Sequence, residues 1–133
     1  MAIEREAFRY PWTRWTFLEM AGDRNFSFVL KLGGMIVGYL VAHRTWEEVY
    51  ISNLAVKGYH RGRGLGLKLV HELLSRSRER GMDLVTLDVR ESNEGAITFY
   101  ERLGFQKVAI RRGYYPNSGE DAYVMALRLK AKK

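Results

Sequence analysis

The feature that most limits how this chain can fold is a glycine-rich loop between a predicted strand and a predicted helix. The strand covers Val49–Val56, and residues 61–66 of the loop read Arg-Gly-Arg-Gly-Leu-Gly. Apolar residues then recur with helical spacing from Gly66 to Leu74. Glycines let the backbone approach a bulky anion, and the N-terminus of a helix attracts one. The segment therefore predicts a strand–loop–helix unit that holds a phosphate group, most naturally a pyrophosphate.

Three interpretations of this loop compete. A Walker A loop is excluded, because no Gly-Lys-Ser/Thr follows the glycines. A dinucleotide-binding loop is open, since Gly62 and Gly64 begin a G-x-G-x-x-G pattern. However, Leu67 stands at the third glycine position, and the preceding strands form hairpins rather than a βαβ unit. A plain connecting loop is the third interpretation, which the alternating Arg-Gly pairs make weak.

The region before the loop predicts antiparallel strands. Alternating apolar residues favour strands over Phe26–Leu32, Met35–Arg44 and Val49–Val56, and Gly33-Gly34 is typical of a two-residue hairpin turn. These strands adjoin without room for crossover helices, so we expect them to pair in antiparallel fashion.

The N-terminal segment predicts two short helices. Ala2 to Arg9 resembles the last turns of a helix that ends before Pro11. Thr13 suits the N-cap of a second helix that runs through Met20.

After the loop, helices and strands alternate. The first helix ends at Gly81, and the remaining elements are predicted over Leu84 to Val89 (strand), Asn93 to Leu103 (helix), Phe105 to Arg112 (strand) and Ala122 to Leu129 (strand). The 133 residues therefore predict a single α/β domain, with a mixed sheet flanked by helices.

The amino-acid composition excludes several classes of catalytic and metal site. The chain has no cysteine, which excludes disulfides, thiolate metal sites and a cysteine nucleophile, and suits a reducing cytoplasm. No signal peptide or apolar run near the ~20 residues of a membrane span is seen. The histidines at 43, 60 and 71 lack metal-ligand spacing, so we expect no metal. A net charge of +7 permits a polyanionic partner, but no nucleic-acid motif accompanies it.

Several motifs together resemble one known family. The loop matches the Gln/Arg-x-x-Gly-x-Gly/Ala motif of the GNAT superfamily of acetyltransferases. Residues 87–93, 96–105, and 111–116 with 120–122 are similar to the ribosomal-protein-alanine N-acetyltransferases (RimI-like) and their archaeal relatives, as is Phe8 with residues 11–13. The resemblance covers nearly the whole chain. It implies a GNAT-like, mostly antiparallel sheet flanked by helices.

The resemblance also implies acetyl-CoA as cosubstrate and assigns residues to it. The strand before the loop pairs with the pantetheine arm, the loop holds the pyrophosphate, and an asparagine contacts the cofactor. The corresponding residues are Leu54, Ala55, Val56, Arg61, Gly62, Arg63, Gly64, Leu65, Gly66, Leu67 and Asn93. On spacing alone, Asn93 is also a good helix N-cap, and the two roles are compatible.

Two residues match the family's catalytic groups. Tyr100 matches the general acid that protonates the departing thiolate, although on its apolar helix face alone core packing is the commoner role. Asp88 matches the general base, which is usually Glu. A carboxylate in an apolar strand is costly unless it is functional or paired, for example with an arginine. Because Asp is one methylene shorter than Glu, a bridging water or another group could complete the proton transfer.

The substrate side and the start of the chain complete the resemblance. Trp12, Tyr114 and Tyr115 match residues that line the family's peptide groove, whereas Pro116 alone would make the tyrosines part of a surface turn. The family opens with a strand at the sheet edge, before its first helix, whereas this chain begins within that helix. A truncated start, or an edge supplied by another subunit, are hypotheses for this difference.

These features predict direct acetyl transfer from acetyl-CoA to a primary amine, most naturally the N-terminal α-amine of a protein, ribosomal proteins included. An α-amine is roughly 10–20% neutral at pH 7, whereas a lysine is under about 0.1% neutral, so a modest base suffices. Two alternatives remain open: acetylation of a lysine or a small-molecule amine, and a catalytically silent module that binds CoA or nucleic acid. We expect a cytoplasmic monomer or homodimer with no specific nucleic-acid or membrane partner.

Overall fold

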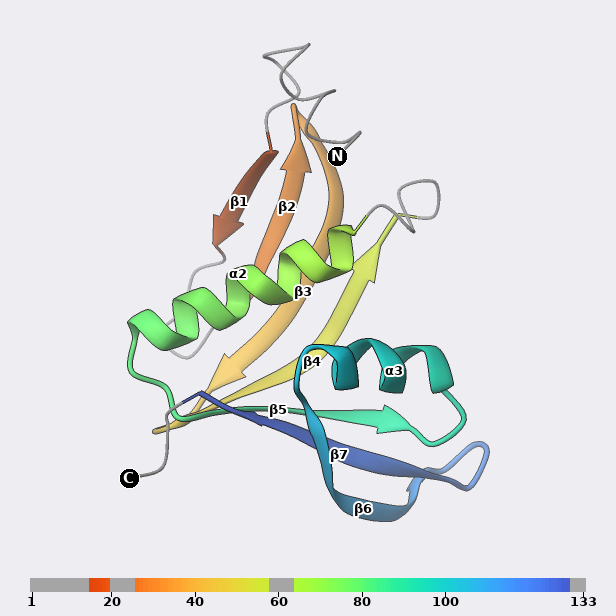
Figure 1. Ribbon diagram of the computed structural model, residues 1–133. Coiled ribbons are helices and arrows are strands. Elements are labelled where there is room, and N and C mark those ends of the chain that lie inside the picture. Colours follow the sequence, from red (N-terminus) through yellow and green to blue (C-terminus); the bar gives the residue numbers. More distant parts are fainter. Residues whose placement is uncertain (1–14, 20–25, 58–63, 130–133) are drawn as a thin grey trace.

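The computed structural model describes residues 15–19, 26–57 and 64–129, and these form a mixed sheet with two helices (Figure 1). The described strands follow the order β1-β2-β3-β4-β5-β7-β6. Only β4 and β5 pair in parallel among them; the other neighbours are antiparallel. The elements are β1 (Trp15–Glu19), β2 (Phe28–Leu32), β3 (Met35–Arg44), β4 (Glu48–Val56), α2 (Leu65–Glu79), β5 (Leu84–Arg90), α3 (Glu94–Arg102), β6 (Gln106–Tyr115) and β7 (Glu120–Arg128).

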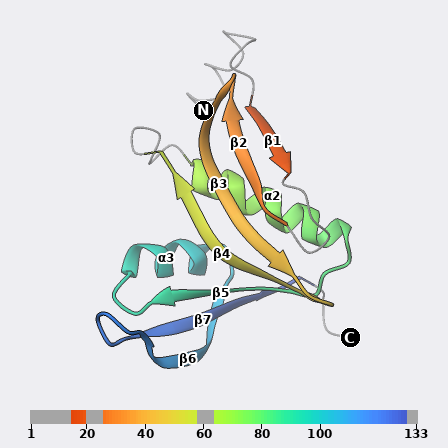
Figure 2. The ribbon, with the colours of Figure 1, turned by 180° about the vertical axis from the view of Figure 1, so that it is seen from behind.

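Strands β2, β3 and β4 confirm the predicted antiparallel meander. Gly33, in the turn between β2 and β3, has a φ of 63°, which a glycine adopts without strain. Figure 2, seen from behind, shows the strands in front of α2. Helix α2 therefore covers one face of this half of the sheet.

The seating of α2 on the sheet follows from its apolar stripe and one glycine. Leu69, Val70 and Leu73 are fully buried, as the helical spacing predicted. A side chain at Gly38 of β3 would lie 2.9 Å from the Ala55 carbonyl oxygen and 3.2 Å from a Leu69 methyl carbon. This glycine therefore lets the helix lie close to the sheet.

The predicted helix from Thr13 to Met20 is wrong over its described part, because Trp15–Glu19 is strand β1. It pairs antiparallel with β2, and the Phe17 ring packs edge-on against Phe28 at 5.5 Å between centroids. The helix prediction rested on a cap, whereas Trp, Thr and Phe favour a strand once a partner strand is present. The predicted helix over Ala2 to Arg9 lies outside the described residues.

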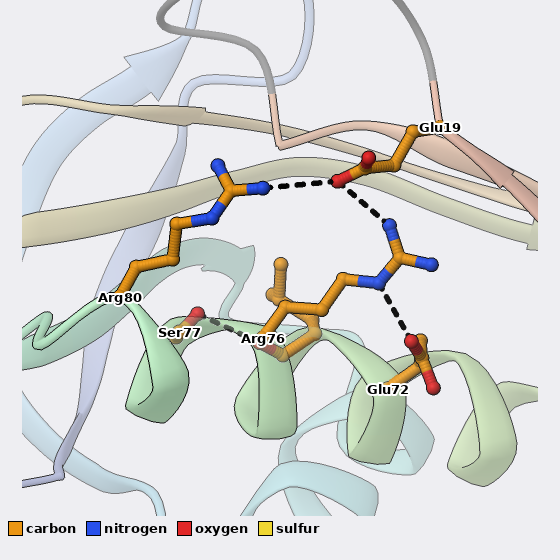
Figure 3. A network of polar contacts seen from close by, with 6 residues as sticks. Glu19, Glu72, Arg76, Ser77 and Arg80 are labelled. Atoms are coloured by element: carbon orange, nitrogen blue, oxygen red, sulfur yellow. Dashed lines mark hydrogen bonds and ion pairs between the residues drawn. The ribbon is translucent and has the colours of Figure 1, made fainter.

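This strand also changes the expectation for the sheet edge. The edge beside β2, where we expected a strand to be lacking, is filled by β1. An ion-pair network holds β1 to α2 (Figure 3). Glu19 accepts from Arg76 at 2.8 Å and Arg80 at 3.5 Å, and Arg76 also pairs with Glu72 at 2.6 Å.

Strands β4 and β5 separate along their length. Their parallel pairing covers Glu48 to Ile51 of β4 and Leu84 to Leu87 of β5. The register between β3 and β4 shifts beside Val41 and Ala42, which places a β-bulge near the point of separation. Beyond this point the two strands diverge, as Figures 1 and 2 both show.

The C-terminal half packs α3 against β5 and β7. Asn93 caps α3 through a hydrogen bond that its Oδ1 accepts from the Ala96 N–H at 3.1 Å, as predicted. Ile97, Tyr100 and Phe105 are buried in the same core as Leu87 of β5. Strand β6 extends three residues beyond its predicted end. Among the described helices, neither is long and apolar enough to cross a membrane.

Candidate active site

A cleft of about 330 Å³ opens where β4 and β5 separate. It is lined from both strands, from α3 and from the end of β6. The lining residues are Ile51, Ser52, Asn53, Leu54, Leu87, Asp88, Val89, Arg90, Asn93, Ala96, Phe99, Tyr100 and Tyr115. The sequence-predicted acid, base and cofactor asparagine are thus brought together in one cavity.

The cleft has chemically different sides because strand residues alternate in direction. Leu87 and Val89 of β5 are buried in the core beneath the helices, where Tyr100 of α3 also lies. Asp88, between them, therefore points to the opposite face of the sheet. The predicted base and the predicted acid consequently approach the cleft from opposite faces.

Asp88 is a buried carboxylate with two partners. Its side chain is 6% exposed; Oδ2 accepts from the Tyr50 hydroxyl at 2.7 Å, and Oδ1 accepts from Arg111 Nε at 3.1 Å. The hydrogen bond to Asp88 raises the pKa of Arg111, which therefore stays charged. The arginine pair that the sequence left open is present, and it offsets the cost of burying the carboxylate.

Sequence reasoning missed Tyr50. Burial, followed by the hydrogen bond to Asp88, raises the pKa of this phenol well above its ordinary value, so the hydroxyl stays protonated. Its alternation with buried Val49 and Ile51 signals a side chain that points away from the core. The sequence does not give the parallel register that sets Tyr50 beside Thr86, two residues before Asp88.

Tyr100 sits in an apolar setting. It is 7% exposed and lies between the rings of Phe99 and Phe105, with centroids 5.0 and 5.3 Å away. Burial raises the pKa of Tyr100 to about 12, because the phenolate would lose its hydration. Tyr100 therefore both packs in the core, as its helix face alone suggested, and lines the cleft.

The predicted cofactor strand runs past the point where β4 and β5 separate. Leu54, Ala55 and Val56 pair with β3 on one side. On the other side, the ladder with β5 ends at Ile51, so among the described residues no strand of the sheet pairs with Leu54 or Ala55 there. Backbone donors and acceptors on such an edge are available to an extended ligand.

The described part of the glycine-rich loop begins α2. Gly64 has a φ of 75° at the N-cap position, and α2 has neither a side-chain cap nor an acidic residue in its first turn, where Leu65, Gly66 and Leu67 lie. A helix N-terminus of this kind leaves backbone N–H groups free for an anion. Arg61, Gly62 and Arg63 lie outside the described residues.

A second, larger groove lies between α2 and α3. Its volume is about 840 Å³, and its walls combine apolar, basic and acidic side chains. The lining residues are Leu67, His71, Glu94, Gly95, Thr98, Phe99, Arg102 and Leu103. Phe99 lines this groove and the cleft alike, so the two cavities adjoin. Sequence reasoning did not find this groove, which depends on how two helices pack.

The predicted substrate tyrosines end strand β6. Tyr115 lines the cleft, and the Tyr114 ring is 5.1 Å away, edge-on. Arg111, which pairs with Asp88, lies 5.8 Å from the Tyr114 ring centroid. Trp12 lies outside the described residues. Among the residues that the structure describes, no three His, Asp or Glu side chains gather as a metal site.

Comparison with known sequences finds clear relatives of this chain. The model of the Acetyltransferase (GNAT) family matches residues 1–105. The [ribosomal protein bS18]-alanine N-acetyltransferase of Escherichia coli K12 is 37% identical over 127 residues, which are 94% of this chain and 86% of the relative.

Solved structures agree as well. The crystal structure of the ribosomal-protein-S18-alanine N-acetyltransferase from Escherichia coli has a TM-score of 0.78 at 36% identity, covering 85% of this chain and 74% of the other. Arabidopsis thaliana Naa50, solved with the bisubstrate analogue CoA-Ac-MVNAL, has a TM-score of 0.71 at 30% identity, covering 77% and 72%. The chain belongs to the GNAT family of acetyltransferases.

Proposed function

We propose that this chain transfers an acetyl group from acetyl-CoA to the N-terminal α-amine of a protein. The relatives named above acetylate a ribosomal-protein alanine or were solved with a CoA–peptide conjugate. The observation that carries the proposal is the cleft between β4 and β5, with a paired carboxylate on one face and a protonated phenol on the other.

The described residues fit acetyl-CoA, which supplies an activated thioester. The edge of β4 at Leu54 and Ala55, beyond the end of the ladder with β5, suits the extended pantetheine arm. The uncapped start of α2 suits the pyrophosphate, and the adjoining groove between α2 and α3 suits the nucleotide. By their place in the sequence, Arg61 and Arg63 would add positive charge beside the pyrophosphate.

Proton removal from the amine falls to the Asp88 face. The amine must attack while neutral, and an α-amine is already roughly 10–20% neutral at pH 7, so a modest base suffices to remove the proton from the remainder. Arg111 donates to Asp88 and so lies beside the negative charge of the carboxylate. Because Asp is a short side chain with both oxygens occupied, a bridging water or the neighbouring Tyr50 hydroxyl carries the proton to it.

Proton delivery to the leaving sulfur falls to Tyr100. With a pKa of about 12, its hydroxyl is protonated throughout the neutral range. The surrounding aromatic rings exclude water and strengthen the hydrogen bond to a departing thiolate.

The experiment is acetyl-CoA-dependent acetylation of three short peptides that begin with Ala, Ser or Met and contain an internal lysine, followed by fragment mass spectrometry. The proposal expects the mass increase on the α-amine. Acetyl on the lysine side chain alone, or turnover of a polyamine but of no peptide, contradicts it. Binding of acetyl-CoA without turnover of any amine indicates a silent module.

A further inference from the structure

Arg90, the last residue of β5, contacts the hairpin between β6 and β7. The Arg90 guanidinium donates to Ser118 Oγ at 3.2 Å and to Glu120 Oε1 at 3.4 Å. Its Cζ atom also lies 3.9 Å from the centroid of the Tyr115 ring. One side chain thus contacts both ends of the turn that joins β6 to β7.

The next residue adds a second attachment. The Glu91 N–H donates to the Asp121 carbonyl oxygen at 3.1 Å, and the Glu91 carboxylate accepts from the Asp121 N–H at 3.4 Å. Asp121 in turn accepts from the Gly113 N–H at 2.8 Å. The hairpin end is therefore tied to β5 through Glu91 as well, so Arg90 is not needed merely to keep the hairpin on the sheet.

The contact with Tyr115 uses a property specific to arginine. A planar guanidinium stacks on an aromatic face while its edge donates hydrogen bonds, and a lysine ammonium cannot do both. Arg90 and Tyr115 both line the cleft, on the side where Asp88 lies. The stack therefore fixes the position of an aromatic ring at the cleft wall.

We propose that Arg90 is a positioning residue for the acceptor peptide. It holds the Tyr115 ring where the peptide passes toward the cleft, and it acts through that ring rather than on the reacting atoms. This inference rests on the proposed function, because it names the residue that sets how the acceptor is seated in that same site.

Steady-state kinetics of Arg90→Met, with peptide and acetyl-CoA varied separately, tests this. The matched control is Arg128→Met. Arg128 ends β7, is 49% exposed against 44% for Arg90, and makes a similar weak pair, with Asp83 at 3.7 Å. We expect Arg90→Met to raise the peptide KM roughly 3–30-fold, the range of a stacked cation, with kcat and the acetyl-CoA KM within about 2-fold. Arg128→Met should change none of these values.

A double-mutant cycle separates positioning from a merely structural role. In a Tyr115→Ala background, Arg90→Met should change the peptide KM by less than about 2-fold, because the ring it positions is gone. Arg90→Lys, which keeps the charge and the exposed site, should still raise the peptide KM. Thermal unfolding of each variant checks that the fold is intact.

Three results, each with a parent that acetylates peptides, would overturn the inference while leaving the proposed function standing. The first is an unchanged peptide KM in Arg90→Met and Arg90→Lys, and the second is a rise confined to the acetyl-CoA KM. The third is that the separate effects of Arg90→Met and Tyr115→Ala on the peptide KM multiply in the double variant. A parent that acetylates no peptide overturns both.

Discussion

At the cleft, the two faces of the sheet carry a phenol and a carboxylate in different surroundings. On the helix-covered face, Tyr100 is enclosed by Phe99 and Phe105, and burial raises the pKa of its hydroxyl to about 12. On the other face, the Asp88 side chain is 6% exposed but lies between Arg111 and Tyr50, which offset the cost of its charge. A phenol in an apolar setting and a carboxylate with two donor partners are thus suited to give and to take a proton, respectively.

The largest effect should come from removing the proton donor on the helix-covered face. Tyr100→Phe keeps the ring and its packing but removes the proton donor, so kcat should fall by about 10²–10³-fold, the usual range for a general acid. Steady-state kinetics with an N-terminal peptide would measure this. The control is Tyr123→Phe, a tyrosine of β7 outside the cleft that packs against the same core. Equal losses in both variants would mean that Tyr100 only packs.

Removing the proton acceptor on the opposite face should lower kcat/KM less at high pH than at low pH. Asp88→Asn removes the proton acceptor, so kcat/KM should fall about 10–100-fold near pH 7. Above pH ~8 most of the α-amine is already neutral, and the difference from the parent should shrink. A pH–rate profile from 6 to 9.5 would measure this.

The control for that profile is Asp83→Asn, which alters a partly exposed aspartate paired with Arg128 outside the cleft. A deficit in Asp88→Asn that stays constant with pH would assign Asp88 to ion pairing rather than to proton transfer.

Tyr50 belongs to the Asp88 face alone. Tyr50→Phe removes the hydrogen bond to Asp88 and should slow turnover about 3–10-fold, without changing the acetyl-CoA KM. The same kinetics apply, with Tyr39→Phe as control, because the Tyr39 hydroxyl accepts only a longer, 3.3 Å bond from Asn53. A rise confined to the acetyl-CoA KM would mean that Tyr50 acts on cosubstrate binding and not together with Asp88.

The smallest effect concerns stability at high pH. Folding raises the pKa of Tyr100 from 10.0 to about 12, so its contribution to stability is fully present below pH 10 and is lost as the pH rises toward 12. Chemical denaturation at pH 9 and pH 11 should show a decline of the unfolding free energy that is about 1 kcal/mol smaller in Tyr100→Phe than in the parent. An identical decline would mean that Tyr100 is not desolvated.

Local patterns were enough to predict much of this fold. The Gly33-Gly34 turn, the buried stripe of Leu69, Val70 and Leu73, and the Asn93 cap each depend on neighbours within a few residues. Such features are encoded in the spacing itself.

Features that depend on pairing between distant segments were missed. Strand β1 forms only because β2 is beside it, and so the cap at Thr13 misled the prediction. Tyr50 meets Asp88 through the register of β4 against β5, and Arg111 reaches Asp88 from β6 across the intervening β7. Arg90 lies two residues after Asp88, on the same face of β5. The sequence around Arg90 does not indicate that its side chain stacks on Tyr115.

The most direct test of the two-sided cleft is a crystal structure with a CoA–acetyl–peptide conjugate. The account predicts the peptide on the face of Asp88, Tyr50 and Arg111, with the sulfur about 3–3.5 Å from the Tyr100 hydroxyl on the helix-covered side. A peptide that lies on the same side as α2 and α3, or a sulfur beyond the reach of Tyr100, would contradict the account.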